Sequence, residues 1–170
     1  FGGDTRHRCE RLTSVALEAV EGLWYDGTDT GVEPVAVAGN PDSRLSGWWP
    51  GTVDDAVTLA DGTIIWHGHT PPPERGHRYV AGHTHPAITI EGVKRPCYLF
   101  GAEAYRDGEL VVLPAFTGLA GGVDIAGRRV SDLPSPLVSS RNLKPVVWDD
   151  DRYYSLGVAP VAHLLPMLSA

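Results

Sequence analysis

Apolar residues recur in the first part of the chain with the spacing of one helix face. Between Arg8 and Trp24 they fall at i, i+3, i+4, i+7, i+8 and i+11, and they are Leu12, Val15, Ala16, Ala19, Val20 and Leu23. This spacing predicts an amphipathic helix of about four turns whose apolar face lies against a sheet. The Gly, Asp and Thr residues between Tyr25 and Glu33 predict a loop that ends the helix.

Short apolar runs separated by turn residues follow, and they predict strands. Pro34–Ala38 has no alternation, as in a strand covered on both faces, and it leads into Gly39-Asn40. Ala56–Ala60 and Thr63–Trp66 flank Asp61-Gly62, which predicts a hairpin with a type I′ turn. Further strands are predicted at Arg78–Ala81, Ala87–Ile90, Cys97–Phe100, Ala102–Tyr105, Leu110–Leu113, Val146–Trp148 and Tyr153–Leu156. The pattern predicts an α/β fold of two mixed β-sheets flanked by helices, with functional side chains at the carboxyl ends of strands.

The composition fits one globular domain that spans residues 1–170. Hydrophobic residues make up 42% of the chain, and no apolar run reaches the roughly eighteen residues of a membrane span. No signal peptide is visible, and Cys9 and Cys97 are isolated thiols, which predicts a cytoplasmic protein. The net charge of −7 excludes a global field that attracts polyanions. Contacts with nucleic acid would therefore need bound cations or local arginines such as Arg44, Arg75 and Arg78.

Five of the seven histidines lie in one stretch, Trp66–Pro86. It contains H-G-H at His67–His69 and G-H-T-H-P at Gly82–Pro86. The glycines and the proline beside these histidines predict turns at strand ends, where the imidazole rings can converge on one site. A lone histidine is more often a surface or capping residue. Two such pairs separated by a short loop indicate a metal centre, because neutral imidazole is the commonest metal ligand in proteins.

Two further polar turns are candidate parts of the same site. Asp4 follows two glycines and lies near His7 in the sequence, so it is either a metal carboxylate or part of an ordinary terminal turn. Asn40 follows a buried strand, at the position where open α/β sheets bind ligands. A polar turn after such a strand is also ordinary architecture, and the sequence leaves both interpretations open.

Four of these features occur in a fixed order: Gly3-Asp4, Gly39-Asn40-x-Asp42, His67-Gly68-His69 and Gly82-His83-Thr84-His85-Pro86. This order resembles the calcineurin-like metallophosphoesterase superfamily, whose motifs run D-x-H, G-D, G-N-H-D/E, H and G-H-x-H. R-P-C-Y-L-F-G at Arg95–Gly101 and L-P-A-F-T-G-L-A-G-G at Leu113–Gly122 resemble the archaeal and bacterial branch related to repair nucleases. That branch includes phosphoesterases encoded beside a DNA ligase and a helicase. The resemblance implies a four-layer α-β-β-α sandwich.

The resemblance also implies two divalent metal ions, most often Mn, with Fe, Zn, Co or Ni as alternatives. Asp4 would bridge the two ions, and His85 would bind the first. The second ion would bind Asn40, His67 and His83. A bridging carboxylate holds two cations about 3.5–4 Å apart, where they activate a shared water and bind a phosphoryl oxygen.

Two departures from the family pattern affect this implied site. The D-x-H motif is absent because the chain begins at about the residue where the second motif starts. We therefore expect either a fragment that lacks its first strand or a degenerate family member. Pro41 stands where many relatives carry a histidine that helps to protonate the leaving group. Our hypothesis is that His69 or His7 replaces it as general acid, since both are expected near the metals.

The activity implied by the resemblance is hydrolysis of phosphodiesters by a metal-bound hydroxide. The substrate would be a nucleotide, a cyclic nucleotide or a single-stranded nucleic acid, because the acidic chain does not favour a long duplex. The family branch also implies partners among DNA-repair proteins. Two alternatives stay open: a non-catalytic scaffold of the same fold, and a phosphomonoesterase that uses the same metal site.

Overall fold

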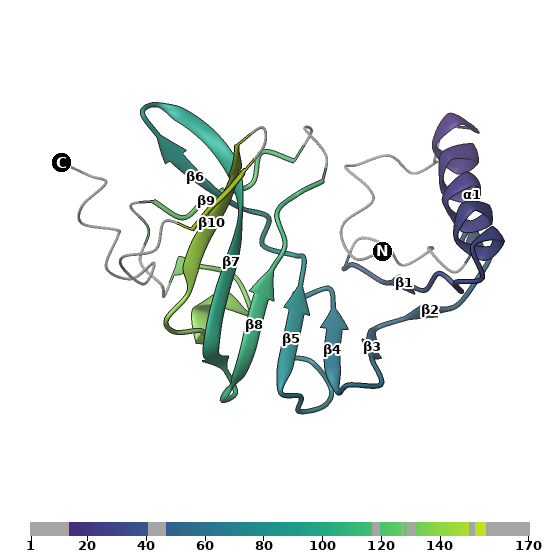
Figure 1. The fold of residues 1–170 in the computed structure, drawn as a ribbon, viewed down its shortest axis with the longest axis horizontal. Coiled ribbons are helices and arrows are strands. Elements are labelled where there is room, and N and C mark those ends of the chain that lie inside the picture. The colour runs from purple at the N-terminus through teal and green to yellow at the C-terminus, as the bar shows by residue number, and fades with distance from the viewer. Residues whose placement is uncertain are drawn as a thin grey trace.

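A computed structural model describes residues 14–40, 47–116, 120–126, 128, 132–149 and 152–155. These residues form an α/β fold in which most strands belong to one large mixed sheet (Figure 1). The elements are α1 (Ser14–Asp29), β1 (Ala36–Val37), β2 (Val53–Asp54), β3 (Ala56–Thr58), β4 (Thr63–Trp66), β5 (Arg78–Ala81), β6 (Pro86–Ile90), β7 (Val93–Tyr105), β8 (Gly108–Val112), β9 (Val123–Asp124), the 3-10 helix η3 (Leu137–Ser139), β10 (Lys144–Asp149) and β11 (Arg152–Ser155). The predicted α/β class with mixed sheets is confirmed, and the predicted strands 63–66 and 78–81 coincide with β4 and β5.

The strand order of the large sheet is β11-β10-β7-β8-β5-β4-β3. In its centre, β4, β5 and β8 run parallel to one another, whereas β3, β7 and β10 pair with their neighbours in the antiparallel sense. Parallel strands end at the same edge of a sheet. The segments that follow β4, β5 and β8 therefore leave the sheet side by side, and this edge carries the histidines.

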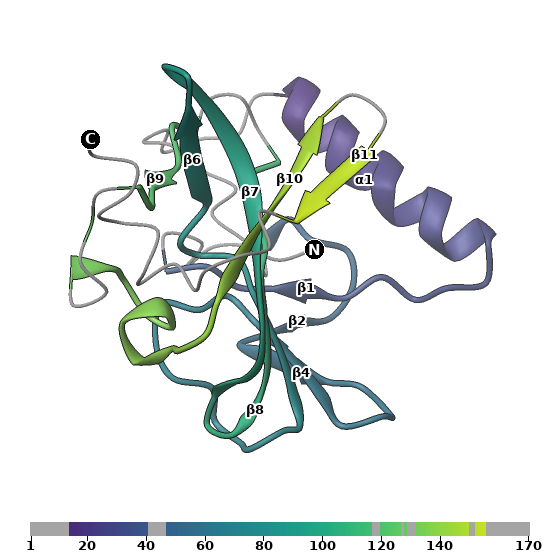
Figure 2. The ribbon, with the colours of Figure 1, turned by 60° about the vertical axis from the view of Figure 1, so that its left-hand side comes forward.

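Strand β7 belongs to two sets of pairings. Its first four residues pair with β6, from Val93 to Pro96, and its later residues pair with β8 and β10. On its other side β6 pairs in parallel with the short strand β9. Figure 2 shows β6 and β9 beside one end of β7, while β8 lies along the other end. This long strand thus connects the central sheet to a small β6–β9 layer that adjoins the histidine edge.

Helix α1 covers the small parallel sheet of β1 and β2 (Figure 1). Ala36 and Trp49 are the buried centre of this unit, and Trp24 of the helix meets Trp49 edge-to-face with ring centroids 5.6 Å apart. Trp48, the neighbour of Trp49 in the sequence, also packs against this cluster. Ala36 and Val37 are both buried, as the unalternating apolar run predicted.

The end of helix α1 differs from the prediction. The helix continues through Tyr25 to Asp29, so the predicted loop is wrong over its first residues. The reason is the position of the capping glycine: Gly31, with φ +78°, is the left-handed residue, and the N–H of Val32 donates to the carbonyl of Gly27 at 3.1 Å. This bond and that from Gly31 to Thr28 at 2.9 Å form a Schellman motif, which ends a helix at its left-handed residue.

The predicted hairpin of β3 and β4 is present, but its turn is not type I′. Only Gly62 has a positive φ (+78°), whereas a type I′ turn needs two such residues. The loop has three residues, and the N–H of Leu59 donates to the carbonyl of Thr63 across it at 2.8 Å. The N–H of Thr63 donates to the Asp61 carboxylate at 2.9 Å, which lowers the pKa of Asp61. A side chain that accepts a backbone hydrogen bond thus favours the longer loop.

Gly108→Ala is expected to lower the free energy of unfolding by about 1–3 kcal/mol, because the added methyl has no space. A Cβ at Gly108, the first residue of β8, would lie 2.8 Å from Tyr79 Cε2 and 2.9 Å from the His77 carbonyl oxygen. Gly22→Ala is the matched control. A Cβ at Gly22, inside α1, meets nothing within 4 Å, so alanine should raise the stability by up to about 1 kcal/mol. Urea denaturation of both variants measures the difference, and equal midpoints would contradict this packing.

Among the described residues, none of the helices combines the length and the apolar character required to cross a membrane.

Candidate metal centre

The histidines follow the ends of the two adjacent parallel strands. Trp66 is the last residue of β4 and lies in register with Ala81, the last residue of β5. His67 comes directly after Trp66, and its carbonyl accepts the backbone N–H groups of Gly82 at 2.9 Å and His83 at 2.7 Å. These two bonds continue the pairing past the strand ends. They hold the backbones of His67 and His83 against each other.

Gly68 turns the chain sharply after His67. Its φ of +106° lies in the region that L side chains rarely adopt, and a Cβ there would lie 3.1 Å from Ala81 Cβ. The indole N–H of Trp66 donates to the carbonyl of Thr70 at 2.8 Å and closes this turn. As a result, the ring centroids of His67 and His69 lie 5.1 Å apart. The structure thus brings both rings of the H-G-H segment to one place.

His67 and His83 face each other directly. His67 Nε2 and His83 Nδ1 are 2.9 Å apart and share a hydrogen bond, in which one nitrogen donates and the other accepts. The ring centroids are 4.8 Å apart, and that of His69 lies 6.1 Å from His83. His67 is 1% exposed, His83 is half-buried and His69 is exposed. The three rings therefore form a gradient from the core to the surface.

The other predicted site residues are placed as follows. Asn40 is exposed, in the turn after β1, and none of the hydrogen bonds found among the described residues joins its side chain to the histidines. His85 lies after His83 with φ +46°, and its carbonyl accepts the N–H of Val123 at 2.9 Å. Asp4 and His7, like Pro41 and Cys9, lie outside the described residues.

Arg78 lies at the opposite edge of the sheet from the histidines. It begins β5, whereas the histidines follow the ends of β4 and β5, and its guanidinium pairs with the carboxylate of Glu109. Arg78 therefore does not lie beside the histidines. The length of strand β5 separates Arg78 from the histidines.

Two supporting contacts could not have been found from local sequence patterns. The buried hydroxyl of Thr84 donates to the carbonyl of Ser135 at 3.3 Å, across a separation of 51 residues. Pro136 lies against the other histidine turn, since its Cδ would be 3.5 Å from a Cβ at Gly68. This segment therefore supports both histidine turns from behind.

Cys97 is a free thiol in the core and is not a candidate nucleophile. Burial, together with the nearby negative charge of Asp124, raises the pKa of Cys97 to about 12. A thiol reacts as its thiolate, so this group is unreactive near neutral pH. The predicted isolated thiol is confirmed at this position.

The histidine centre supplies nitrogen donors in the described residues. No three His, Cys, Asp or Glu side chains of that part of the chain are arranged so that they could hold a metal ion. What is present is a facing pair, His67 Nε2 and His83 Nδ1, with His69 beside it. The oxygen ligand that the sequence predicts, Asp4, belongs to the residues that are not described.

No protein-family model matches this chain, and no curated protein sequence matches it. Among solved structures, the chain is similar to the crystal structure of Pseudomonas putida nuclease MPE, with a TM-score of 0.58 and 22% sequence identity. The similarity covers 91% of this chain and 68% of that chain. At this identity the similarity establishes the α/β fold alone.

Proposed function

We propose that this protein is a metal-dependent phosphodiesterase of the calcineurin-like metallophosphoesterase type, with nucleic acid or a nucleotide as its substrate. The observation that carries the proposal is the facing pair of His67 Nε2 and His83 Nδ1 at the carboxyl ends of adjacent parallel strands. Ligands in open α/β sheets bind at this edge. The similarity to a bacterial nuclease supports a nucleic-acid substrate.

The separation of the two nitrogens fits a shared cation. Imidazole nitrogens bind first-row divalent ions at about 2.0–2.1 Å, so two of them on one ion lie about 3.0–3.4 Å apart. The observed 2.9 Å between His67 and His83 is close to this range, and the two backbones are already fixed by hydrogen bonds. To bind one ion with both nitrogens, the rings would turn from their mutual hydrogen bond towards the ion, while the backbones stay in place.

In this proposal His67 and His83 hold one ion together with Asn40, while Asp4 bridges to a second ion that His85 completes. Two imidazoles suit Mn, Fe, Zn, Co or Ni better than Ca, and Mn is the ion that the family resemblance implies most often. When bound, such ions polarise a phosphoryl oxygen and make a bound water more acidic. The described histidines would position the ion and, by excluding solvent around the buried His67, strengthen its field.

His69 is the proposed proton donor for the leaving group. It is exposed, and its ring centroid lies 5.1 Å from that of His67, so it borders the site without being enclosed in it. A general acid needs this position, because it must contact both the substrate and a source of protons. His7 remains the other proposed donor, and alanine at either position separates them through the pH–rate profile.

The test compares two aryl substrates after removal of metal. The full chain is treated with chelator and assayed with Mn²⁺ on bis-p-nitrophenyl phosphate, a diester, and on p-nitrophenyl phosphate, a monoester. We expect hydrolysis that appears with Mn²⁺, is lost with excess EDTA, and favours the diester. Diester hydrolysis that ignores EDTA would overturn the metal mechanism, preference for the monoester would establish a phosphomonoesterase, and absence of any turnover would support a non-catalytic scaffold.

A further inference from the structure

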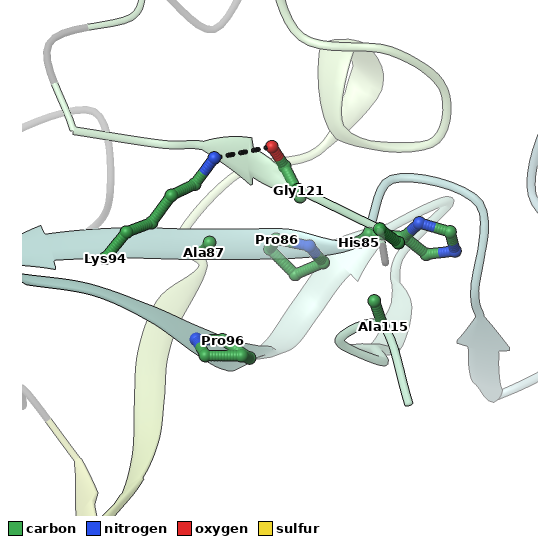
Figure 3. Close-up of a pocket in the computed structure, with 9 residues that line it drawn as sticks. His85, Pro86, Ala87, Lys94, Pro96, Ala115 and Gly121 are labelled. Atoms are coloured by element: carbon green, nitrogen blue, oxygen red, sulfur yellow. Dashed lines mark hydrogen bonds between the residues drawn. The ribbon is translucent and has the colours of Figure 1, made fainter. Parts of the chain in front are cut away.

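A hollow with a volume of about 220 Å³ adjoins the histidine centre. It is lined by residues of β6, of β7, and of the two segments that follow β8: His85, Pro86, Ala87, Lys94, Pro96, Ala115, Ala120, Gly121 and Gly122. Figure 3 shows His85 at one end and Lys94 at the other, with Pro86 and Ala87 between them. The hollow is thus a short slot that leads away from a predicted metal ligand.

Backbone hydrogen bonds fix this slot to the edge that carries the histidines. The N–H of Leu113 donates to the carbonyl of Ala81 at 2.8 Å, which places the start of the 113–116 segment beside the end of β5. The N–H of Val123 donates to the carbonyl of His85 at 2.9 Å. Both walls of the slot therefore extend from the strand ends that position His83. A chain bound in the slot would continue towards the histidines.

The slot combines an apolar floor with a local positive charge. Pro86, Ala87 and Pro96 supply the floor, and Lys94 stands at the rim. The ammonium of Lys94 donates one hydrogen bond to the carbonyl of Gly122, at 2.9 Å, and an ammonium has three hydrogens to donate. Lys94 is one of only two lysines in a chain of net charge −7. A cation held at this rim is suited to a phosphate group.

An exposed aromatic ring follows the slot directly. Phe116 is 82% exposed, more than any other large hydrophobic residue of the described part, and it is the next residue after Ala115 of the slot. A ring this exposed is accessible for stacking on an unpaired nucleobase, because every base presents a π-face to an aromatic ring.

We propose that the slot binds one nucleotide of a single-stranded nucleic acid, next to the phosphodiester at the histidines. Lys94 contacts its phosphate, and Phe116 stacks on a base. A duplex does not fit this arrangement because its bases are already stacked. This inference rests on the proposed function and specifies the substrate of the same site.

The experiment uses a variant that fills the slot. A Cβ at Gly121 meets nothing within 4 Å, and Gly121 is not among the glycines with positive φ, so Gly121→Leu can be accommodated and its side chain occupies the slot. Phe116→Ala and Lys94→Gln remove the proposed contacts. The matched controls are Phe100→Ala, an exposed phenylalanine on β7, and Lys144→Gln, the other lysine.

Binding of fluorescein-labelled oligo(dT), oligo(U) and a DNA duplex is measured by anisotropy in EDTA, and hydrolysis of bis-p-nitrophenyl phosphate is measured with Mn²⁺. We expect Gly121→Leu and Phe116→Ala to weaken single-strand binding about tenfold or more, and Lys94→Gln to reduce the salt slope by about 1. The two controls, Phe100→Ala and Lys144→Gln, should keep single-strand binding and hydrolysis of the aryl diester within about twofold of wild type.

The two proposals fail in different ways. If wild-type protein hydrolyses the aryl diester but binds no single strand, or if Gly121→Leu and Phe116→Ala bind like wild type, the slot proposal is overturned and the metal centre is not. If the variants weaken binding but wild type shows no Mn²⁺-dependent hydrolysis, the proposed function is overturned and the slot stands. Equal loss of binding in the two controls, or equal binding of duplex, would also overturn the slot.

Discussion

His83→Ala is expected to lower the kcat/KM of Mn²⁺-supported diester hydrolysis by about 100-fold or more. The substitution removes the Nδ1 atom that faces His67 Nε2 at 2.9 Å, and with it one of the two nitrogens proposed to hold the same ion. Loss of groups that only orient metal ligands already costs about 10–100-fold in affinity or activity, so loss of a ligand should cost at least as much. Initial rates over a range of Mn²⁺ concentrations measure both the rate and the apparent metal affinity.

His77→Ala is the matched control for this experiment. His77 is exposed and precedes β5, so it lies at the opposite end of the strand that leads to His83. The same chemical change there should leave kcat/KM within about twofold of wild type. An equal loss of kcat/KM in both variants would indicate a general effect of losing a histidine. If Mn²⁺ activates His83→Ala as strongly as wild type, the facing pair of His67 and His83 does not hold the ion. Circular dichroism checks that both variants are folded.

The central part of the fold could be predicted from sequence because its pattern is local. Thr63–Trp66 and Arg78–Ala81 are short apolar runs bounded by glycine or proline, and both strands were found with the predicted bounds. Their parallel pairing then brings His67 and His83 together, because the residues after two paired parallel strands leave the sheet at the same edge. His67 and His83 therefore lie together because each directly or closely follows a predicted strand and because the two strands pair in parallel.

What could not be predicted depends on backbone angles and on distant contacts. The pattern of glycines near the end of α1 does not tell whether Gly27 or Gly31 takes the left-handed conformation, and the structure selects Gly31. The contact between Thr84 and Ser135 joins residues 51 apart, and no periodicity indicates it. The left-handed backbone of His85 was equally hidden, since most left-handed residues are glycine and histidine is an uncommon one.

His85→Gly and His85→Ala are expected to lose the same Mn²⁺-dependent activity but to differ in stability. His85 has φ +46°, a conformation that disfavours any residue with a Cβ by about 1 kcal/mol relative to glycine. Both variants lack the imidazole proposed to bind the first ion. Only glycine relieves the backbone, so His85→Gly should unfold at a temperature about 2–4 °C above His85→Ala.

Glu91 provides the control that separates backbone strain from function. It has φ +51° in the exposed turn between β6 and β7, away from the histidine edge, so Glu91→Gly should also exceed Glu91→Ala in stability by about 1 kcal/mol. Neither change at Glu91 should alter hydrolysis. Suppose that His85→Gly and His85→Ala differ in stability as the two Glu91 variants do, but both keep full activity. The imidazole of His85 would then bind no catalytic ion. Loss of activity in both His85 variants, with the stability difference intact, would mean that a strained conformation is retained at this position because the side chain is needed at the metal.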